Sequence, residues 1–231
     1  MTRYAGKEAV VVGGATGTGL VIATRLVEGG AKVLLAVPAE ADRAVAVAQL
    51  GSSASVVALD AGAPDTGGKL PAAVAHRLGA VDFLFVTTDI ARLAPTEDVT
   101  EAHYDKEFAA HTKQTYFTVQ ALLPLMADDG AIVFSTSAPG DAAAAPRTQG
   151  APGTGVAGMT QAALAAFAQV LSAELAERRI RVNTLTPRLC PRGSAEDVAR
   201  AALSLAVDAR FTSGLQLAVD GGPAPFVPSL N

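Results

Sequence analysis

Short apolar runs of strand type alternate with stretches of helical period along the chain. Such alternation predicts a parallel sheet covered by helices on both faces, because each parallel connection needs a crossover that packs on one face. We therefore expect one α/β domain over residues 1–231, with a Rossmann-like doubly wound sheet of about seven strands flanked by helices. The expected strands are residues 9–12, 32–37, 55–59, 81–86, 131–135, 180–185 and 215–219.

The first expected strand runs into a glycine-rich turn, VVGGATGTGL at residues 11–20. Its glycines fall where a strand turns into a helix. Glycine there lets backbone N–H groups approach a diphosphate at the positive end of the helix, and it allows close packing of helix on sheet. The turn indicates descent from a nucleotide-binding protein, which does not by itself establish that a nucleotide binds here. Its candidate cofactor-binding residues are Gly13, Ala15, Thr16, Gly17, Thr18 and Gly19.

Two helices can be placed from local signals. One is a long helix that opens at GVAGMTQAAL, residues 155–164; its period is clearest over residues 160–178, where apolar side chains repeat at steps of three and four, with charged residues towards the end. Ser194 is an expected N-cap, because Asp197 follows three residues later as in a capping box.

Charge and composition exclude several classes of partner. The net charge is -4 and no run of Lys and Arg occurs, so neither nucleic acid nor a membrane surface is an expected partner. Apolar runs such as 31–37 are far shorter than the roughly 18 to 20 residues of a membrane-spanning helix. The start of the chain lacks a secretory layout and Cys190 is the single cysteine, so we expect a cytoplasmic protein with no metal site.

Several landmarks in order make the chain resemble the short-chain dehydrogenase/reductase family. They are Gly13-x-x-x-Gly17-x-Gly19, Asp60 after the third strand, Ser137 in IVFSTS, Asn183 in RVNTLTP, and LAVDGG at 217–222. The resemblance implies an NAD(P)-binding fold and a small-molecule substrate. It implies that Asp60 contacts the adenine ring, that Thr87 and Pro187 lie beside the cofactor, and that Ser137 polarises the substrate carbonyl.

The catalytic pair of that family is absent. Counting back from Asn183, its Tyr-x-x-x-Lys falls on residues 157–161, which begin with Ala157 and end with Gln161. No such pair follows Ser137, because the last lysine is Lys113 and the tyrosines are Tyr4, Tyr104 and Tyr116. In the family the Tyr delivers the proton and the Lys lowers its pKa, so ordinary ketoreduction is not expected here.

Other positions depart from the family in parallel. Asp89 stands where a glycine is usual, Arg188 replaces another glycine, and His111 replaces the Asn of the fourth helix. The usual lid after the sixth strand is missing. Val37 and Pro38 offer neither an acid for ribose hydroxyls nor an Arg for a 2′-phosphate, so the choice between NAD and NADP stays open. Dinucleotide binding itself also stays open, because the glycine turn and Asp60 favour it whereas Asp89, Arg188 and the missing Lys do not.

Three functions follow from this pattern. The first is a repurposed enzyme of secondary metabolism that carries out a non-redox step on a carbonyl compound: cyclisation, isomerisation or dehydration. The second is an NAD(P)H-dependent ketoreductase with a non-standard proton donor, and the third is a non-catalytic pseudoenzyme subunit. For the first two, Ser137 is the expected hydrogen-bond donor and His111 the expected acid/base; alternatively, His111 caps a carbonyl or fills the space of the missing Lys.

The resemblance also implies assembly. We expect a homodimer or homotetramer that uses the helices within residues 101–126 and 160–179, with the strand at 217–222 as a further contact.

Overall fold

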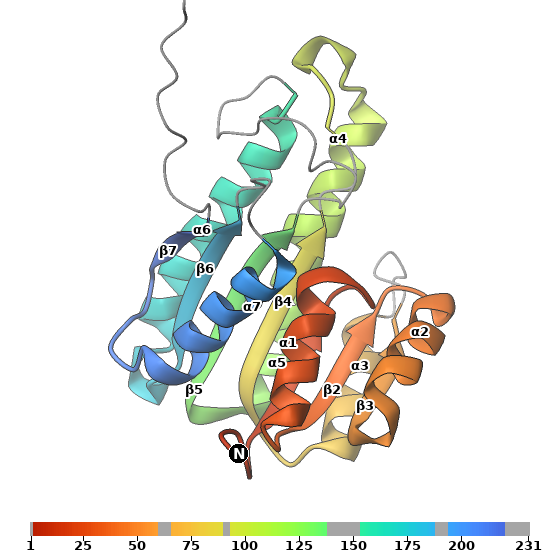
Figure 1. Ribbon diagram of the computed structural model, residues 1–231. Helices are drawn as coiled ribbons and strands as arrows, with labels where there is room; N and C mark the ends of the chain where they lie inside the picture. Colours follow the sequence, from red (N-terminus) through yellow and green to blue (C-terminus); the bar gives the residue numbers. More distant parts are fainter. Residues whose placement is uncertain (1, 60–65, 90–92, 138–152, 188–193, 220–231) are drawn as a thin grey trace, which may run out of the picture.

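The computed structural model describes residues 2–59, 66–89, 93–137, 153–187 and 194–219. Seven strands form one sheet whose order is β3-β2-β1-β4-β5-β6-β7, and every neighbouring pair is parallel. This is the predicted doubly wound sheet (Figure 1). The strands are β1 (Glu8–Val12), β2 (Lys32–Val37), β3 (Ala54–Ala58), β4 (Val81–Asp89), β5 (Met126–Ser137), β6 (Arg181–Pro187) and β7 (Gln216–Val219).

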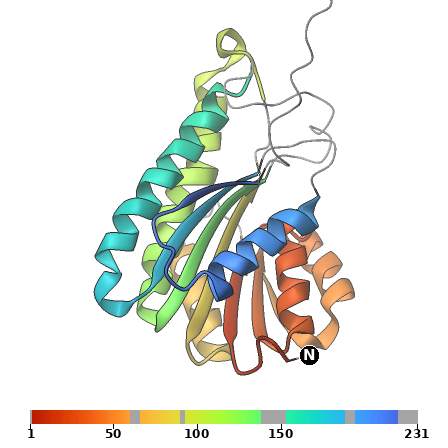
Figure 2. The same cartoon turned by 60° about the vertical axis from the view of Figure 1, so that its left-hand side comes forward.

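Helices cover both faces of the sheet (Figure 2). The α-helices are α1 (Gly17–Glu28), α2 (Glu40–Leu50), α3 (Thr66–Arg77), α4 (Glu101–Phe108), α5 (Gln114–Leu122), α6 (Gly155–Glu174) and α7 (Ala195–Leu203). Two π-helical turns follow α4 and α7, namely η3 (Ala109–Lys113) and η7 (Ser204–Asp208). The 3₁₀ turns are η1 (Gly51–Ser53), η2 (Thr96–Asp98), η4 (Leu123–Leu125) and η6 (Ala176–Arg178).

The core consists of two layers, because successive strand residues point to opposite faces. One layer packs α1, α2 and α7 against residues such as Val11 and Leu35, and the other packs α3, α5 and α6 against Val10 and Leu34. All four of these strand side chains are 0% exposed, so the sheet centre is closed to water. The loops therefore lie at the two ends of the strands, outside this closely packed core.

The long helix α6 begins at Gly155, which confirms the predicted opening at residues 155–164. Its end differs from the prediction, because the last turn is the 3₁₀ turn η6. By length and composition alone α6 could also cross a bilayer, which the short strand-type runs did not suggest. Its buried residues, Leu164, Ala168 and Leu171 among them, pack on the sheet, and a core helix of this kind meets the same criteria.

Asn183, which the family pattern pointed out, holds the last strand in place. Its side chain is 0% exposed in β6. Its Nδ2 donates to the Thr212 carbonyl at 2.9 Å, and its Oδ1 accepts from the Leu215 N–H at 3.0 Å. These two bonds fix the turn that leads into β7.

The predicted N-cap of α7 is confirmed as a reciprocal capping box. Ser194 Oγ accepts from the Asp197 N–H at 3.3 Å, and Asp197 Oδ2 accepts from the Ser194 N–H at 3.0 Å. The pKa of Asp197 is lowered, chiefly by its side-chain hydrogen bond to Ser194 and next by the Ser194 backbone N–H.

This cap is expected to act as a pH-dependent stabiliser. A lowered folded-state pKa gives stability that is present above the unfolded-state pKa and is lost as the pH falls through the folded-state pKa. Ser194→Ala should lower the thermal unfolding midpoint at about pH 7, and the difference from wild type should shrink at about pH 2, where carboxyl groups are protonated. Ser172→Ala, which removes an exposed hydroxyl bonded within α6, is the control. An equal loss at both pH values would contradict the assignment.

Candidate active site

The glycine turn is shaped by the strand beside it. Gly13 has φ +154°, and a Cβ built there would lie 1.7 Å from Thr87 Oγ1. A Cβ built at Gly19 would lie 2.9 Å from the same Thr87 oxygen. Thr87 is buried and donates its hydroxyl hydrogen to the Val12 carbonyl at 3.2 Å. Both glycines are therefore needed because Thr87 of β4 packs into the turn between β1 and α1.

Gly17 serves a different purpose. Its φ is +64°, a left-handed conformation that favours glycine, and nothing lies within 4 Å of a Cβ built there. It opens α1, whose N-cap Thr16 makes no side-chain capping bond and whose first turn has no acidic residue. The N-terminus of α1 is therefore without a side-chain cap and has open space at Gly17, and a diphosphate group fits such a position.

The remaining residues of the turn face inward. The side chains of Ala15 and Thr18 are only 2% and 5% exposed. Ala15 packs in the core layer formed by α1, α2 and α7. These two predicted contacts could reach a cofactor through backbone atoms rather than side chains.

A cavity of about 200 Å³ lies beside the turn, at the carboxyl ends of β1, β2 and β4. Parallel α/β sheets bind ligands at this edge. The lining is apolar below the turn and carries hydroxyl, amide and imidazole groups where η3 and α5 close it. The lining residues are Val12, Gly13, Gly14, Ala36, Val37, Pro38, Leu59, Leu70, Val86, Thr87, Thr88, Ala110, His111, Gln114, Thr115 and Thr118.

His111, the predicted acid/base, lies in this wall. It belongs to the π-helical turn η3 and is 2% exposed. Its Nε2 lies 2.9 Å from Oε2 of Glu107, itself 4% exposed, so its partner is a carboxylate and not the backbone carbonyl of the alternative interpretation. His103 Nε2 lies 3.9 Å from the other oxygen of Glu107. One helix face thus carries an imidazole, a carboxylate and an imidazole in a buried column.

Glu107 is the residue that the sequence interpretation missed. The signal was available, since residues four apart lie on the same face of a helix and an acid at that distance can pair with an imidazole. Such a pair resembles the base and orienting carboxylate of hydrolytic enzymes, in which the carboxylate holds the ring and stabilises its protonated form. The pair can therefore take up or release a proton at the wall of the cavity.

The other predicted catalytic residue is placed only by its backbone. Ser137 ends β5 and is in register with Asp89, the last residue of β4. The preceding residues, Thr88 of β4 and Thr136 of β5, are also in register, and Thr88 lines the cavity. The backbone of Ser137 therefore lies at the end of the sheet where His111 lines the cavity, and hydrogen bonding by Ser137 remains a prediction.

Three predicted positions add little from geometry. Pro187 ends β6 and pairs with Val219, and within the described residues it does not line the cavity. Asp60 and Arg188 lie outside the described residues. Within the described part of the chain, no group of three or more His, Cys, Asp or Glu could hold a metal.

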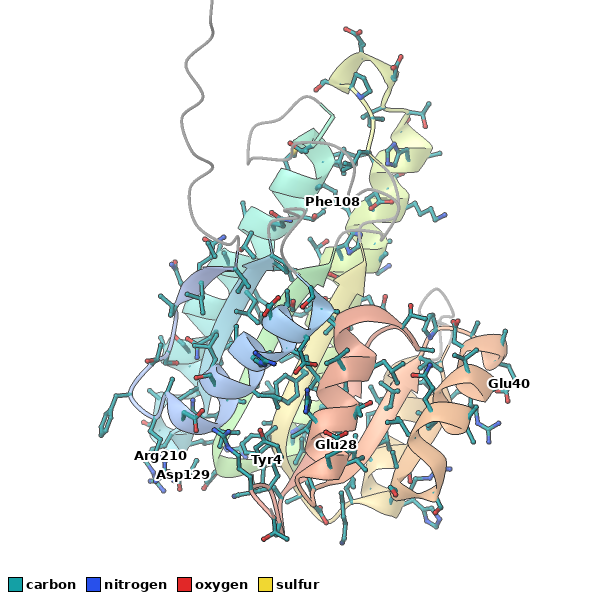
Figure 3. The ribbon with its side chains drawn as sticks, viewed as in Figure 1. Tyr4, Glu28, Glu40, Phe108, Asp129 and Arg210 are labelled. Carbon is teal, nitrogen blue, oxygen red and sulfur yellow. The ribbon has the colours of Figure 1, made fainter. Side chains whose placement is uncertain are left out.

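The start of α6 carries small and amide side chains at the positions where the family pattern predicts Tyr and Lys. Ala157 is 8% exposed, and the fully buried Thr160 donates its hydroxyl hydrogen to the Ala157 carbonyl at 3.0 Å. Gln161 is half-buried. No phenol or amine is present at these positions, whereas the Glu107–His111 pair lies on the neighbouring helical segment, which contacts α6. In Figure 3, the labelled Phe108 of α4 lies at the end of the molecule that carries the Glu107–His111 pair, and Tyr4, Asp129 and Arg210 lie at the opposite end.

Comparison with known proteins gives consistent matches. Residues 13–192 match the family model described as enoyl-(acyl carrier protein) reductase. An oxidoreductase of Sarocladium schorii is 30% identical over 249 residues, which cover 96% of this chain and 97% of the relative. Versicolorin reductase 1 of Aspergillus parasiticus is 26% identical, covering 80% of this chain and 70% of the relative.

A solved structure shows the same architecture. The blue fluorescent protein from a metagenomic library, determined in complex with NADPH, superposes with a TM-score of 0.84 at 25% identity. The match covers 95% of this chain and 98% of that protein. Both sequence and architecture thus point to one family.

Proposed function

The chain belongs to the short-chain dehydrogenase/reductase family, and from that premise we propose that it binds a nicotinamide dinucleotide and acts on the carbonyl group of a small molecule. The observation that carries the proposal is the cavity that joins the glycine turn to the buried Glu107–His111 pair. The proposal covers NAD and NADP alike.

The residues present fit the adenosine and diphosphate half of such a cofactor. Gly17 and the uncapped N-terminus of α1 would hold the diphosphate, and the apolar wall around Val37 and Leu59 suits an adenosine. Asp60 is proposed to contact the adenine, and Thr87 and Pro187 to lie along the rest of the molecule. When bound in its reduced form, the cofactor supplies a hydride.

Reduction is the reaction that the relatives favour. Their names include reductases of fungal secondary metabolism, so a secondary-metabolite carbonyl is the proposed substrate class. In this reaction His111 donates the proton to the forming alcohol oxygen, Glu107 stabilises the ring while it is protonated, and Ser137 donates a hydrogen bond to the same oxygen.

A non-redox step is the second candidate. The specific observation in its favour is the absence of a Tyr-x-x-x-Lys after Ser137, with Ala157 and Gln161 at the expected positions. A base at His111 can remove a proton beside a carbonyl while Ser137 stabilises the oxygen, which is sufficient for isomerisation, cyclisation or dehydration. A subunit without catalysis is the third outcome.

Deuterium transfer separates these three functions. The purified protein is incubated with NADH and NADPH that carry deuterium at C4 of the nicotinamide, together with a panel of polycyclic aromatic ketones and hydroxynaphthalenes. We expect an alcohol that contains one deuterium, with an equal amount of oxidised cofactor, detected by mass spectrometry. A dehydrated or isomeric product without deuterium would support the second candidate, and no conversion with any compound would leave only the binding role.

We also propose a homodimer or homotetramer built on the outer face of α5 and α6. Tyr116 and Phe117 of α5 are 47% and 50% exposed, and Met159 and Val170 of α6 are 51% and 57% exposed. Tyr116 also contacts Phe167 at 5.1 Å between ring centroids. An apolar surface of this kind on a two-helix face suits contact with a second copy.

Placing charge on that face should separate the subunits. The double variant Tyr116→Glu with Phe117→Glu is expected to sediment as a monomer at micromolar concentration, because charges buried in an interface without partners are strongly unfavourable. Val47→Glu, an equally simple change at an exposed apolar residue of α2, should leave the assembly intact. A wild-type protein that sediments as a monomer would contradict the proposal.

A further inference from the structure

Two polar atoms on the wall of the cavity are buried without a hydrogen-bond partner among the described residues. They are Thr88 Oγ1, from the end of β4, and His111 Nδ1, from η3. Burying a polar atom without a partner is unfavourable. Both residues line the same cavity, so a ligand that enters it is the candidate partner for both atoms.

Glu107 decides what His111 offers to such a ligand. Its Oε2 lies 2.9 Å from His111 Nε2, and an ionised carboxylate can only accept a hydrogen bond. With Glu107 ionised, Nε2 carries the hydrogen of the neutral ring, which leaves Nδ1 with a lone pair. The cavity thus presents an acceptor at His111 and a hydroxyl at Thr88 that can donate.

One acceptor and one donor are complementary to a neutral hydroxyl group. A phosphate or carboxylate needs donors or cations, and the described lining of the cavity contains no Lys or Arg. A ligand carbonyl needs donors alone and would leave Nδ1 of the neutral ring unsatisfied, so a carbonyl suits only the protonated ring. An alcohol satisfies both atoms, because its hydrogen is donated to Nδ1 while its oxygen accepts from Thr88.

We propose that Thr88 and the Glu107–His111 pair form a hydroxyl-binding site in this cavity, with Glu107 as a positioning residue that keeps Nδ1 of His111 as the acceptor. Identification of the ligand rests on the proposed function, since two hydroxyl sources are then available. One is a ribose hydroxyl of the dinucleotide, and the other is the hydroxyl of the alcohol formed from the carbonyl substrate.

The first test measures the tautomer of His111 and needs no activity. The chain has three histidines, His76, His103 and His111, so ¹⁵N-histidine spectra can be assigned with single variants. In the neutral ring we expect a protonated Nε2 and an unprotonated Nδ1 for wild type. Glu107→Gln, whose amide oxygen still accepts, should keep this form, whereas Glu107→Leu should give a mixture. A wild-type ring protonated at Nδ1 would overturn the proposal.

The second test identifies the hydroxyl. Thr88→Val keeps the shape of the side chain and removes its hydroxyl, and Thr24→Val on α1, outside the cavity lining, is the control. Calorimetry with NADH, NADPH and ADP-ribose measures the cofactor side, and KM for the alcohol in the reverse oxidation measures the substrate side. About tenfold weaker binding of the nucleotides in Thr88→Val assigns a ribose hydroxyl, and a KM raised about tenfold with unchanged nucleotide binding assigns the substrate alcohol.

The two tests also separate this site from the proposed function. The ¹⁵N signal of His111 Nδ1 should shift when ADP-ribose, NADH or the alcohol product is added to wild type, and less so in Thr88→Val. If none of these ligands shifts the signal, the two atoms hold water only and the hydroxyl site is wrong. If ligands shift the signal but no deuterium is transferred, the site stands and reduction fails.

Discussion

Replacing His111 by Asn is expected to lower kcat by a factor of about 10² to 10⁴ at saturating cofactor and substrate. Asn can still form hydrogen bonds, but it cannot exchange a proton near neutral pH. No phenol lines the cavity to substitute, since none of the three tyrosines, Tyr4, Tyr104 and Tyr116, is among its described lining residues and Ala157 stands at the family's Tyr position. The rate is measured as formation of the deuterated product in the assay described above.

His76→Ala is the matched control for this change. His76 is an exposed histidine in the last turn of α3, away from the cavity lining, and its removal should leave kcat unchanged. Unfolding midpoints of both variants should be compared with that of wild type, because His111 is buried. A folded His111→Asn protein with wild-type kcat would show that the proton comes from elsewhere.

Replacing Gly13 by Ala is expected to destabilise the protein by about 3 kcal/mol or more. The new methyl group would lie 1.7 Å from Thr87 Oγ1 and 2.9 Å from the Thr87 carbonyl oxygen, and φ +154° is strained for any side chain. The unfavourable contact falls in the turn itself, so dinucleotide binding should be lost with it. Denaturant unfolding and calorimetric titration measure the two effects.

A glycine in open space provides the control. Gly158 lies within α6, and nothing is within 4 Å of a Cβ built there, so Gly158→Ala should stabilise the protein by about 0.5 to 1 kcal/mol. Adding Thr87→Ala to Gly13→Ala removes the hydroxyl and should recover part of the loss. If Gly13→Ala were tolerated as well as Gly158→Ala, the packing of Thr87 into the turn would be wrong.

The order of the sheet and the place of the glycine turn could be predicted because the signals are local. Apolar runs of strand length separated by helical periods leave little choice beyond right-handed crossovers in a parallel sheet. The start of α6 at residue 155 could be predicted as well, whereas its last turn is the 3₁₀ turn η6, which the repeat of apolar residues does not distinguish from α-helix. The capping box at Ser194 was readable because its partners are three residues apart.

What the sequence by itself determined is the fold class, the glycine turn and the absence of a Tyr-x-x-x-Lys after Ser137, since each depends on residue identity and short spacing. Only the tertiary structure decided that Glu107 pairs with His111 and that Thr88 faces the same cavity. A Glu four residues from a His occurs on many exposed helix faces, and only the structure shows that this pair is buried. Thr88 and His111 line one cavity because the sheet brings β4 against η3, a contact that no local pattern predicts.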